Sequence, residues 1–212
     1  MAETLAQPNA GGGGGLDVLE PGYGDDGRPG EPARRQVETA KLGLWIALGS
    51  ITMLFAAFTS AYLVRSSGND WLPLVVPSIL YPNSLLLIAS SVSMEIARRR
   101  FLSFWPVSFR KWLLVTAVLG VIFLAGQVSA WKALAKQGIF LRSHPHSSFF
   151  YVLTGLHGVH LLAGVLVLLY VLVLATRRSL TPGESSSPEL AATYWHFVDV
   201  LWLYLFVVLF YL

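Results

Sequence analysis

Two ionisable side chains, His196 and Asp199, lie three residues apart in an otherwise apolar stretch near the C-terminus, YWHFVDVLWLYLF. An aspartate near the centre of a membrane helix costs about 2.5–3.5 kcal/mol on insertion scales. Because residues three apart share a helix face, His196 is the expected partner of Asp199. We expect a buried polar clasp that also binds a neighbouring helix; a proton-relay or ligand role is the alternative.

A second pair with the same spacing, His157 and His160, lies in the stretch FFYVLTGLHGVHLLAGVLVLLY. Gly155 and Gly158 fall on a different face of this helix, and Gly164 follows two turns later. Glycines let a neighbouring backbone approach closely, and histidines hydrogen-bond across helices. These residues therefore favour helix packing over metal binding, and the helix is expected to be buried on more than one side.

Imidazole is a common ligand of metals and haem, so these histidines raise the question of a cofactor site. From the helical rise, His160 lies roughly 24 Å from the inner end of its span, and His196 roughly 9 Å from that of the last span. Shared ligation needs donor atoms within about 2 Å of one metal. The predicted separation is too large for this, and we expect no metal or haem in this chain.

The elements that must position these residues are membrane helices. Of the 212 residues, 54% are hydrophobic and 13% charged, whereas an average soluble domain has about 25% charged residues. A spanning helix needs about 20 mostly apolar residues, and lipid-exposed backbone must be satisfied within the helix. We expect an all-α integral membrane protein with five transmembrane helices, at 42–64, 74–96, 111–130, 149–175 and 191–211.

The ends of this bundle carry two further signals. Pro77 and Pro82 lie early in the second span, so a start nearer Pro82 is the alternative there. Residues 1–40 contain a glycine run from Gly11 to Gly15 and no apolar core. We expect a disordered Gly- and Pro-rich cytoplasmic tail over 1–40, followed by the membrane bundle over 41–212.

Basic residues predict the orientation, because they accumulate in cytoplasmic connections. Most of them precede the first span or lie in the second and fourth connections, which places the N-terminus in the cytoplasm and the C-terminus in the periplasm. The opposite side has four: Arg65, Lys132, Lys136 and Arg142. Aromatic residues that prefer the membrane interface lie near predicted helix ends: Trp105, Trp112, Trp131, Tyr194 and Trp195.

Several classes of function are excluded or disfavoured. The chain has no Cys, which excludes disulfides and thiolate sites. A formal net charge of +3 gives no argument for nucleic acid. No Gly-rich phosphate loop, HExxH or GxSxG motif is present. A secondary transporter would be expected to show repeats and broken helices, which five spans with one buried acid fit poorly.

The stretches FFYVLTGLHGVHLLAG (149–164) and YWHFVDVLWLYLF (194–206) resemble subunit III of the haem–copper respiratory oxidases, the cytochrome c oxidase subunit III family. The resemblance extends over roughly residues 41–212. KLGLWIALGSITMLFAAFTSAYLV resembles the third helix of the long form, NSLLLIASSVS the next helix, and Gln127 with Trp131 the one after. It implies the short five-helix bacterial form, in which two N-terminal helices are missing.

The resemblance implies a non-catalytic subunit of an aerobic terminal oxidase, which reduces oxygen, pumps protons and lies in the bacterial inner membrane. Haems and copper would belong to partner subunits I and II, with none in this chain. The subunit would support assembly, stability and proton uptake of subunit I. Other implied partners are membrane lipids, small accessory subunits, and cytochrome c or quinol as electron donor to the complex.

Two positions depart from the family. A glutamate usual in the first of these helices is absent where Ile51 follows Ser50, and Ala130 stands three residues after Gln127 where a second is common. Proton exchange by those acids therefore cannot apply here. The phospholipid cleft of the long form would be incomplete. The alternatives are subunit III of a quinol oxidase, a stand-alone membrane cytochrome and a small transporter.

Overall fold

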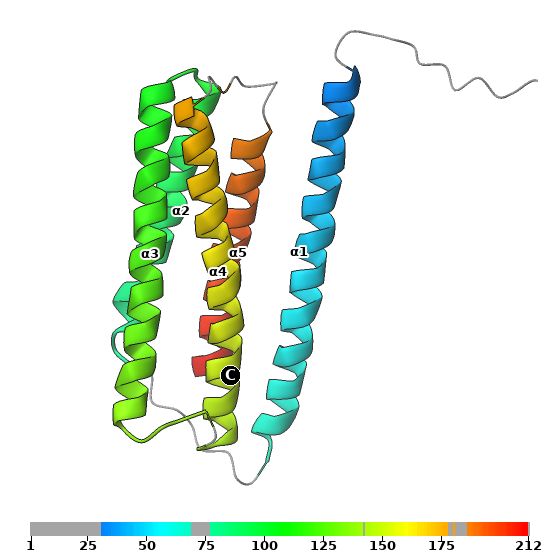
Figure 1. Ribbon diagram of the computed structural model, residues 1–212. Coiled ribbons are helices and arrows are strands. Elements are labelled where there is room, and N and C mark those ends of the chain that lie inside the picture. Colours follow the sequence, from blue (N-terminus) through cyan, green and yellow to red (C-terminus); the bar gives the residue numbers. More distant parts are fainter. Residues whose placement is uncertain (1–30, 69–76, 142, 178–179, 181–185, 212) are drawn as a thin grey trace, which may run out of the picture. The chain divides into compact units, whose positions relative to one another are not determined.

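The computed structural model in Figure 1 describes residues 31–68, 77–141, 143–177, 180 and 186–211, with side chains from residue 37 onward. This part of the chain contains five α-helices and no strand, which confirms the all-α class. The helices are α1 (Glu31–Ser66), α2 (Leu80–Leu102), α3 (Pro106–Lys136), α4 (Pro145–Arg177) and α5 (Ser187–Tyr211). All except α2 are long and apolar enough to cross a membrane.

The helices extend beyond the predicted spans at most ends. Helix α1 begins at Glu31, so the predicted disordered tail is wrong for residues 31–40, and residues 1–30 lie outside the described part. The segment EPARRQVETA is rich in Glu, Ala, Arg and Gln, which have high helix propensity, and its proline lies in the first turn. Helix α2 begins at Leu80; residues 74–76 of the predicted second span are not among those described.

Helices α2, α3, α4 and α5 form a closed ring. Helix α3 packs between α2 and α4, and α5 closes the ring by contacting both α4 and α2. The core of the ring contains fully buried aromatic side chains, among them Trp195, Trp202 and Phe123. Short connections join these helices, and Phe104 (φ 58°) and Gly138 (φ 77°) adopt left-handed conformations in two of them.

Helix α1 is attached to this ring by side chains alone, because none of its Cα atoms lies within 8 Å of a Cα atom in another helix. In Figure 1 it runs alongside the ring as a separate rod. Its buried residues form one stripe: Leu48, Phe55, Thr59 and Tyr62. The Phe55 ring lies 5.7 Å from that of His160, and the Tyr62 ring lies 5.6 Å from that of Phe149. These rings join α1 to α4, and α5 also lies beside α1, because residues of both helices line one groove.

Helix α2 buries polar side chains and exposes apolar ones, the opposite of a surface helix in a soluble protein. Several of the polar side chains that lower its hydropathy are buried against neighbouring helices: Asn83, Ser84, Ser90 and Ser93. Its opposite face exposes apolar side chains at helical spacing, Leu85, Ile88 and Val92. The low hydropathy of α2 therefore reflects these buried polar groups together with the charged residues of its C-terminal end, where Arg99 and Arg100 are exposed.

Candidate polar site in the helix ring

Two tryptophans on α5 hold that helix against α2. The Trp195 indole Nε1 donates a hydrogen bond to Ser90 Oγ at 3.2 Å, and Trp202 Nε1 donates to Ser84 Oγ at 2.9 Å. Residues 195, 199 and 202 recur at helical spacing on one face of α5. Asp199 therefore lies between these two interhelical bonds.

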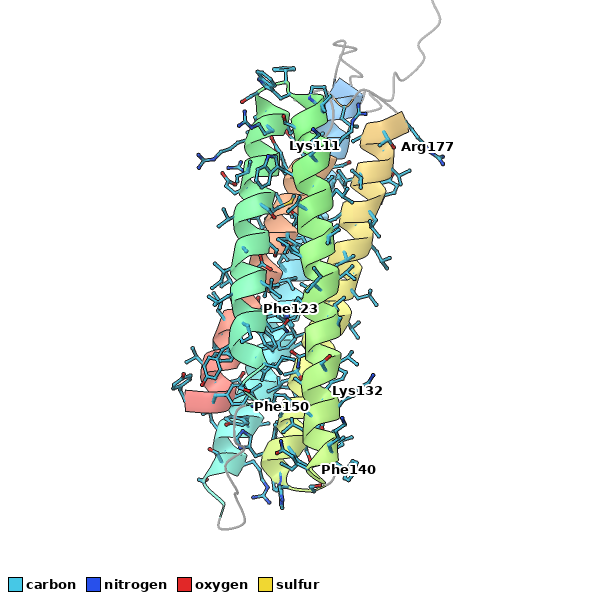
Figure 2. All side chains as sticks on the ribbon, turned by 90° about the vertical axis from the view of Figure 1, so that its left-hand side faces the viewer. Lys111, Phe123, Lys132, Phe140, Phe150 and Arg177 are labelled. Carbon is cyan, nitrogen blue, oxygen red and sulfur yellow. The ribbon has the colours of Figure 1, made fainter. Side chains whose placement is uncertain are left out.

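The end of the ring that carries Lys111 and Arg177 is here called the Arg177 end (Figure 2). His196 contacts α2 in the half of α5 that is nearer to this end. Its Nδ1 lies 2.7 Å from Ser91 Oγ, and its Nε2 lies 3.9 Å from Glu95 Oε2. The Glu95 carboxylate in turn accepts hydrogen bonds from the Nε atoms of Arg98 and Arg99, both at 2.9 Å. A polar series thus runs from exposed arginines to a half-buried imidazole.

Asp199 does not pair with His196. The aspartate is 4% exposed, and neither carboxyl oxygen has a hydrogen-bond partner among the described residues. Ser91 lies close enough to influence the carboxyl group, but its hydroxyl group is bonded to His196. The predicted direct bond between the two residues is absent because the His196 ring turns toward α2. Of this pair, only His196 forms a hydrogen bond to a neighbouring helix.

His157 and Gln127 extend the buried polar set across the ring. His157 is 0% exposed, with its ring 5.1 Å from that of Trp202 and 6.0 Å from that of Phe123. Gln127 lies one turn along α3 from Phe123 and is also buried. Neither nitrogen of His157 and neither amide atom of Gln127 has a hydrogen-bond partner within the described chain. Three helices thus each contribute one unpartnered polar side chain to the core.

The three histidines of the predicted motif face three different neighbours. His196 faces α2 and His157 faces the core, whereas the His160 ring contacts Phe55 of α1. The His160 Nδ1 lies 2.7 Å from the carbonyl oxygen of Leu156 in its own helix. Among the described residues, no group of three His, Asp or Glu side chains could hold a metal ion.

The predicted difference in depth between His160 and His196 is wrong. Gly164 of α4 contacts Trp195 and Tyr194 of α5, which fixes the axial offset of the two antiparallel helices. At a rise of 1.5 Å per residue, counted from the level that Gly164 shares with Tyr194 and Trp195, His160 and His196 are only about 4 Å apart along the helix axis. The prediction failed because α4 extends beyond the start of α5 at the Arg177 end (Figure 1), whereas it assumed that both helices end together.

The predicted packing glycines have different surroundings. A Cβ atom at Gly164 would lie 3.2 Å from the Trp195 ring, so a side chain there would require the ring to shift by a few tenths of an ångström. A Cβ atom at Gly155 would lie 4.0 Å from Trp131, and one at Gly158 would have no atom within 4 Å. Gly155 is thus in ordinary van der Waals range of α3, whereas Gly158 approaches no other helix within the described chain. Gly155 also lines a groove between α3 and α4.

Sequence reasoning missed Gly120 and misplaced Trp195. Trp195 was expected at the membrane interface but is fully buried. Gly120 of α3 lies so close to its indole that a Cβ atom would be 2.6 Å from Cη2. A glycine within an apolar span was the available signal, but the sequence does not indicate which side chain occupies the space beside it.

The unpartnered polar residues lie inside the ring and do not line its main surface grooves. Four grooves on the described chain have other linings, and none of these four includes His157, His196, Asp199 or Gln127. Aromatic rings enclose His157, and Asp199 lies between two tryptophans that are bonded to α2. The geometry suits a buried interhelical cluster better than a substrate pocket.

Comparison with known proteins gives one family. Residues 30–212 match the family model for cytochrome c oxidase subunit III. The chain is 36% identical over 181 residues to cytochrome c oxidase subunit 3 of Thermostichus vulcanus, covering 80% of this chain and 85% of that protein. It is 31% identical over 179 residues to the probable cytochrome c oxidase subunit 3 of Mycobacterium bovis, with coverages of 81% and 87%. The corresponding Synechocystis protein is 36% identical over 178 residues, with coverages of 79% and 73%.

Proposed function

Because the chain belongs to the cytochrome c oxidase subunit III family, we propose that it is a non-catalytic subunit that supports the assembly and stability of subunit I in an aerobic oxidase. The observation that carries this proposal is the match over residues 30–212, which includes both polar stretches and all five helices. Relatives that share the family name are parts of an oxidase complex, so this chain is expected to act within one.

The proposed location is the bacterial inner membrane, with α2 as a fifth transmembrane helix. Four helices already have the length and apolarity to cross. The exposed apolar face of α2, with Leu85, Ile88 and Val92, suits contact with lipid or with another membrane subunit. The Arg177 end is assigned to the cytoplasm because basic residues accumulate on that side of membrane proteins. The C-terminus is then periplasmic.

The haems and copper of the complex are assigned to subunits I and II. The orientations of His157, His160 and His196 support this assignment, because each imidazole faces a different neighbour. The proposed contribution to proton uptake rests on Glu95, which lies toward the Arg177 end, and on His196, which lies deeper along the ring. Both side chains are only partly buried.

Cytochrome c is the preferred electron donor of the complex. The relatives at 31–36% identity are all named for cytochrome c oxidases, which favours this donor over quinol. Because the donor would be bound by another subunit, the preference concerns the complex and not a site in this chain.

The test is affinity purification of the tagged full-length chain from its native membrane in mild detergent. We expect two larger redox subunits, identified by mass spectrometry, and haem bands in a reduced-minus-oxidised spectrum. An unrelated tagged membrane protein from the same cells is the control. A chain that is recovered alone without haem bands would contradict the proposal. Haem bands from the isolated chain would favour a membrane cytochrome, and a quinol-type subunit II would favour the quinol oxidase.

A further inference from the structure

We propose that a pocket at the Arg177 end binds a small organic carboxylate, with the apolar body of the ligand against aromatic side chains and its carboxylate at Arg110. The pocket has a volume of about 220 Å³ and lies where the turn between α2 and α3 meets the C-terminal end of α4. Lys111 and Arg177 mark this end of the ring in Figure 2. The pocket is separate from the buried polar cluster, and the proposed role of the subunit does not require it.

Aromatic side chains form most of the pocket wall. Phe101 and Phe109 are buried, with ring centroids 5.2 Å apart, whereas Phe104 and Trp105 are exposed. All four line the pocket. Ligand sites typically combine apolar and aromatic walls with a few polar anchors, and those for drug-sized ligands have volumes of about 300–1,000 Å³. The smaller volume here suits a ligand that consists of one aromatic ring and a short polar group.

Arg110 supplies the polar anchor of the pocket. It lines the pocket, and its Nε atom is buried without a hydrogen-bond partner within the described chain. A buried donor without a partner is costly, and a guanidinium group stays charged. Nε and a neighbouring Nη form the planar fork that binds a carboxylate through two parallel hydrogen bonds. A bound carboxylate would therefore satisfy Nε and neutralise the charge together.

No acidic side chain is among the described residues that line the pocket, so none of them fills this role. Glu95, the acid of α2, accepts hydrogen bonds from Arg98 and Arg99 instead. Exposed cations on the neighbouring turns add positive charge, among them Arg100 and Lys111. This charge attracts anions. Aromatic walls cannot replace the hydration of inorganic phosphate, so the geometry suits an anion with an apolar body.

The backbone at Phe104 indicates a role for its side chain. Phe104 has φ 58°, the Phe104 N–H donates to the carbonyl oxygen of Phe101 at 3.1 Å, and the Trp105 N–H donates to that of Arg100 at 3.0 Å. This pattern is the Schellman cap of a helix, in which glycine usually occupies the left-handed position. A phenylalanine there is strained, and strained residues cluster at ligand sites. Trp105 already supplies an exposed ring for the membrane interface, so the strain at Phe104 is better explained by the pocket.

The test is a titration of the full-length chain in mild detergent with para-fluorophenylacetate, followed by fluorine NMR of the ligand. We expect saturable binding that inorganic phosphate does not displace. The neutral analogue para-fluorophenylacetamide should bind much more weakly. Arg110→Gln should weaken binding about tenfold or more, the effect of losing a hydrogen bond to a charged group. Arg110→Lys keeps the charge without the fork and should restore binding only in part.

Phe104→Gly separates a binding role from a structural one. Glycine relieves the left-handed backbone, so the Tm of the chain should stay the same or rise, while the affinity for para-fluorophenylacetate should fall. Two matched controls should bind like the wild-type chain. Lys111→Gln removes the exposed cation next to Arg110, and Phe140→Gly removes an exposed aromatic ring at the opposite end of the ring of helices (Figure 2).

Several results would overturn the proposal. It is wrong if para-fluorophenylacetate and its amide bind equally, if phosphate displaces the carboxylate, or if Arg110→Gln and Phe104→Gly bind like the wild-type chain. The same titration is made on the complex with which the chain purifies. Loss of binding there would also overturn the proposal, because another subunit would then occupy the pocket.

Discussion

Replacing Gly120 with alanine is expected to destabilise the helix ring by forcing the Trp195 indole out of its position. An alanine Cβ would lie 2.6 Å from Cη2 of Trp195 and 3.1 Å from Cγ2 of Val165. The indole has little freedom to move, because Gly164 contacts another part of the same ring and Nε1 is hydrogen-bonded to Ser90. Trp195 thus contacts α2, α3 and α4 at once.

The size of the effect follows from the overlap. Carbon atoms in favourable contact are about 3.5–4.0 Å apart, so the ring would have to move by roughly 1 Å. Overpacking of this kind costs about 1–3 kcal/mol. For a chain of this length, about 2–4 °C in Tm corresponds to each kcal/mol, so the expected decrease in Tm is about 2–12 °C.

The assay is thermal unfolding of the full-length chain in detergent, followed by far-UV circular dichroism. Gly49→Ala is the matched control, because a Cβ at Gly49 has no atom within 4 Å. It should stabilise α1 by up to about 1 kcal/mol through helix propensity alone. Trp195→Phe removes the Cη2 atom, so Gly120→Ala should cost less in that background, with a coupling of about 0.5–3 kcal/mol.

Two results would refute this reasoning. The first is a Gly120→Ala variant as stable as Gly49→Ala, which would show that the ring accommodates the methyl group without strain. The second is strict additivity of Gly120→Ala and Trp195→Phe, because residues in contact are expected to couple. Either result would mean that the two residues are not packed against each other in the folded chain.

Three further substitutions test other contacts. Ser84→Ala should lower the free energy of unfolding by about 1–3 kcal/mol in the same thermal assay, because the Trp202 indole N–H would lose its acceptor in the core. Asp199→Asn should leave stability unchanged, since neither carboxyl oxygen has a partner within the described chain; a loss above about 1 kcal/mol would show that the carboxyl group has a bond that asparagine cannot replace. Phe55→Ala should increase amide hydrogen exchange in α1 while α2–α5 stay protected, because Phe55 is one of the few side chains that attach α1 to the ring. Equal exchange in all five helices would argue against this attachment.

The positions of the helices were largely predictable, because hydropathy over about 20 residues reports the thickness of a bilayer directly. All five predicted spans overlap a helix of the structure. The ends were less predictable, since polar turns continue a helix beyond the apolar segment, as at Glu31–Ala40. The buried serines of α2 are explained only by the neighbouring helices, because Thr116, Trp195 and Trp202 form hydrogen bonds with them.

The buried polar residues were identifiable from the sequence, but their partners were not. The spacing of His196 and Asp199 predicts that they share a helix face, and it says nothing about the ring turning toward Ser91. The same limit applies to His160, whose neighbour Phe55 lies on a helix far away in the chain. Spacing relates residues within one helix, whereas a hydrogen bond between helices depends on how the helices are rotated about their axes.

Local composition and continuous motifs are enough to predict the membrane class, the location of the helices, the unusual polar residues and the resemblance to the oxidase subunit family. The ring formed by α2–α5, the fit of Trp195 against Gly120 and Gly164, and the groove beside Gly155 and Lys132 appear only in the folded chain. Such lateral packing depends on the axial offset and rotation of each helix. Those quantities are set by the summed contacts of side chains from several helices.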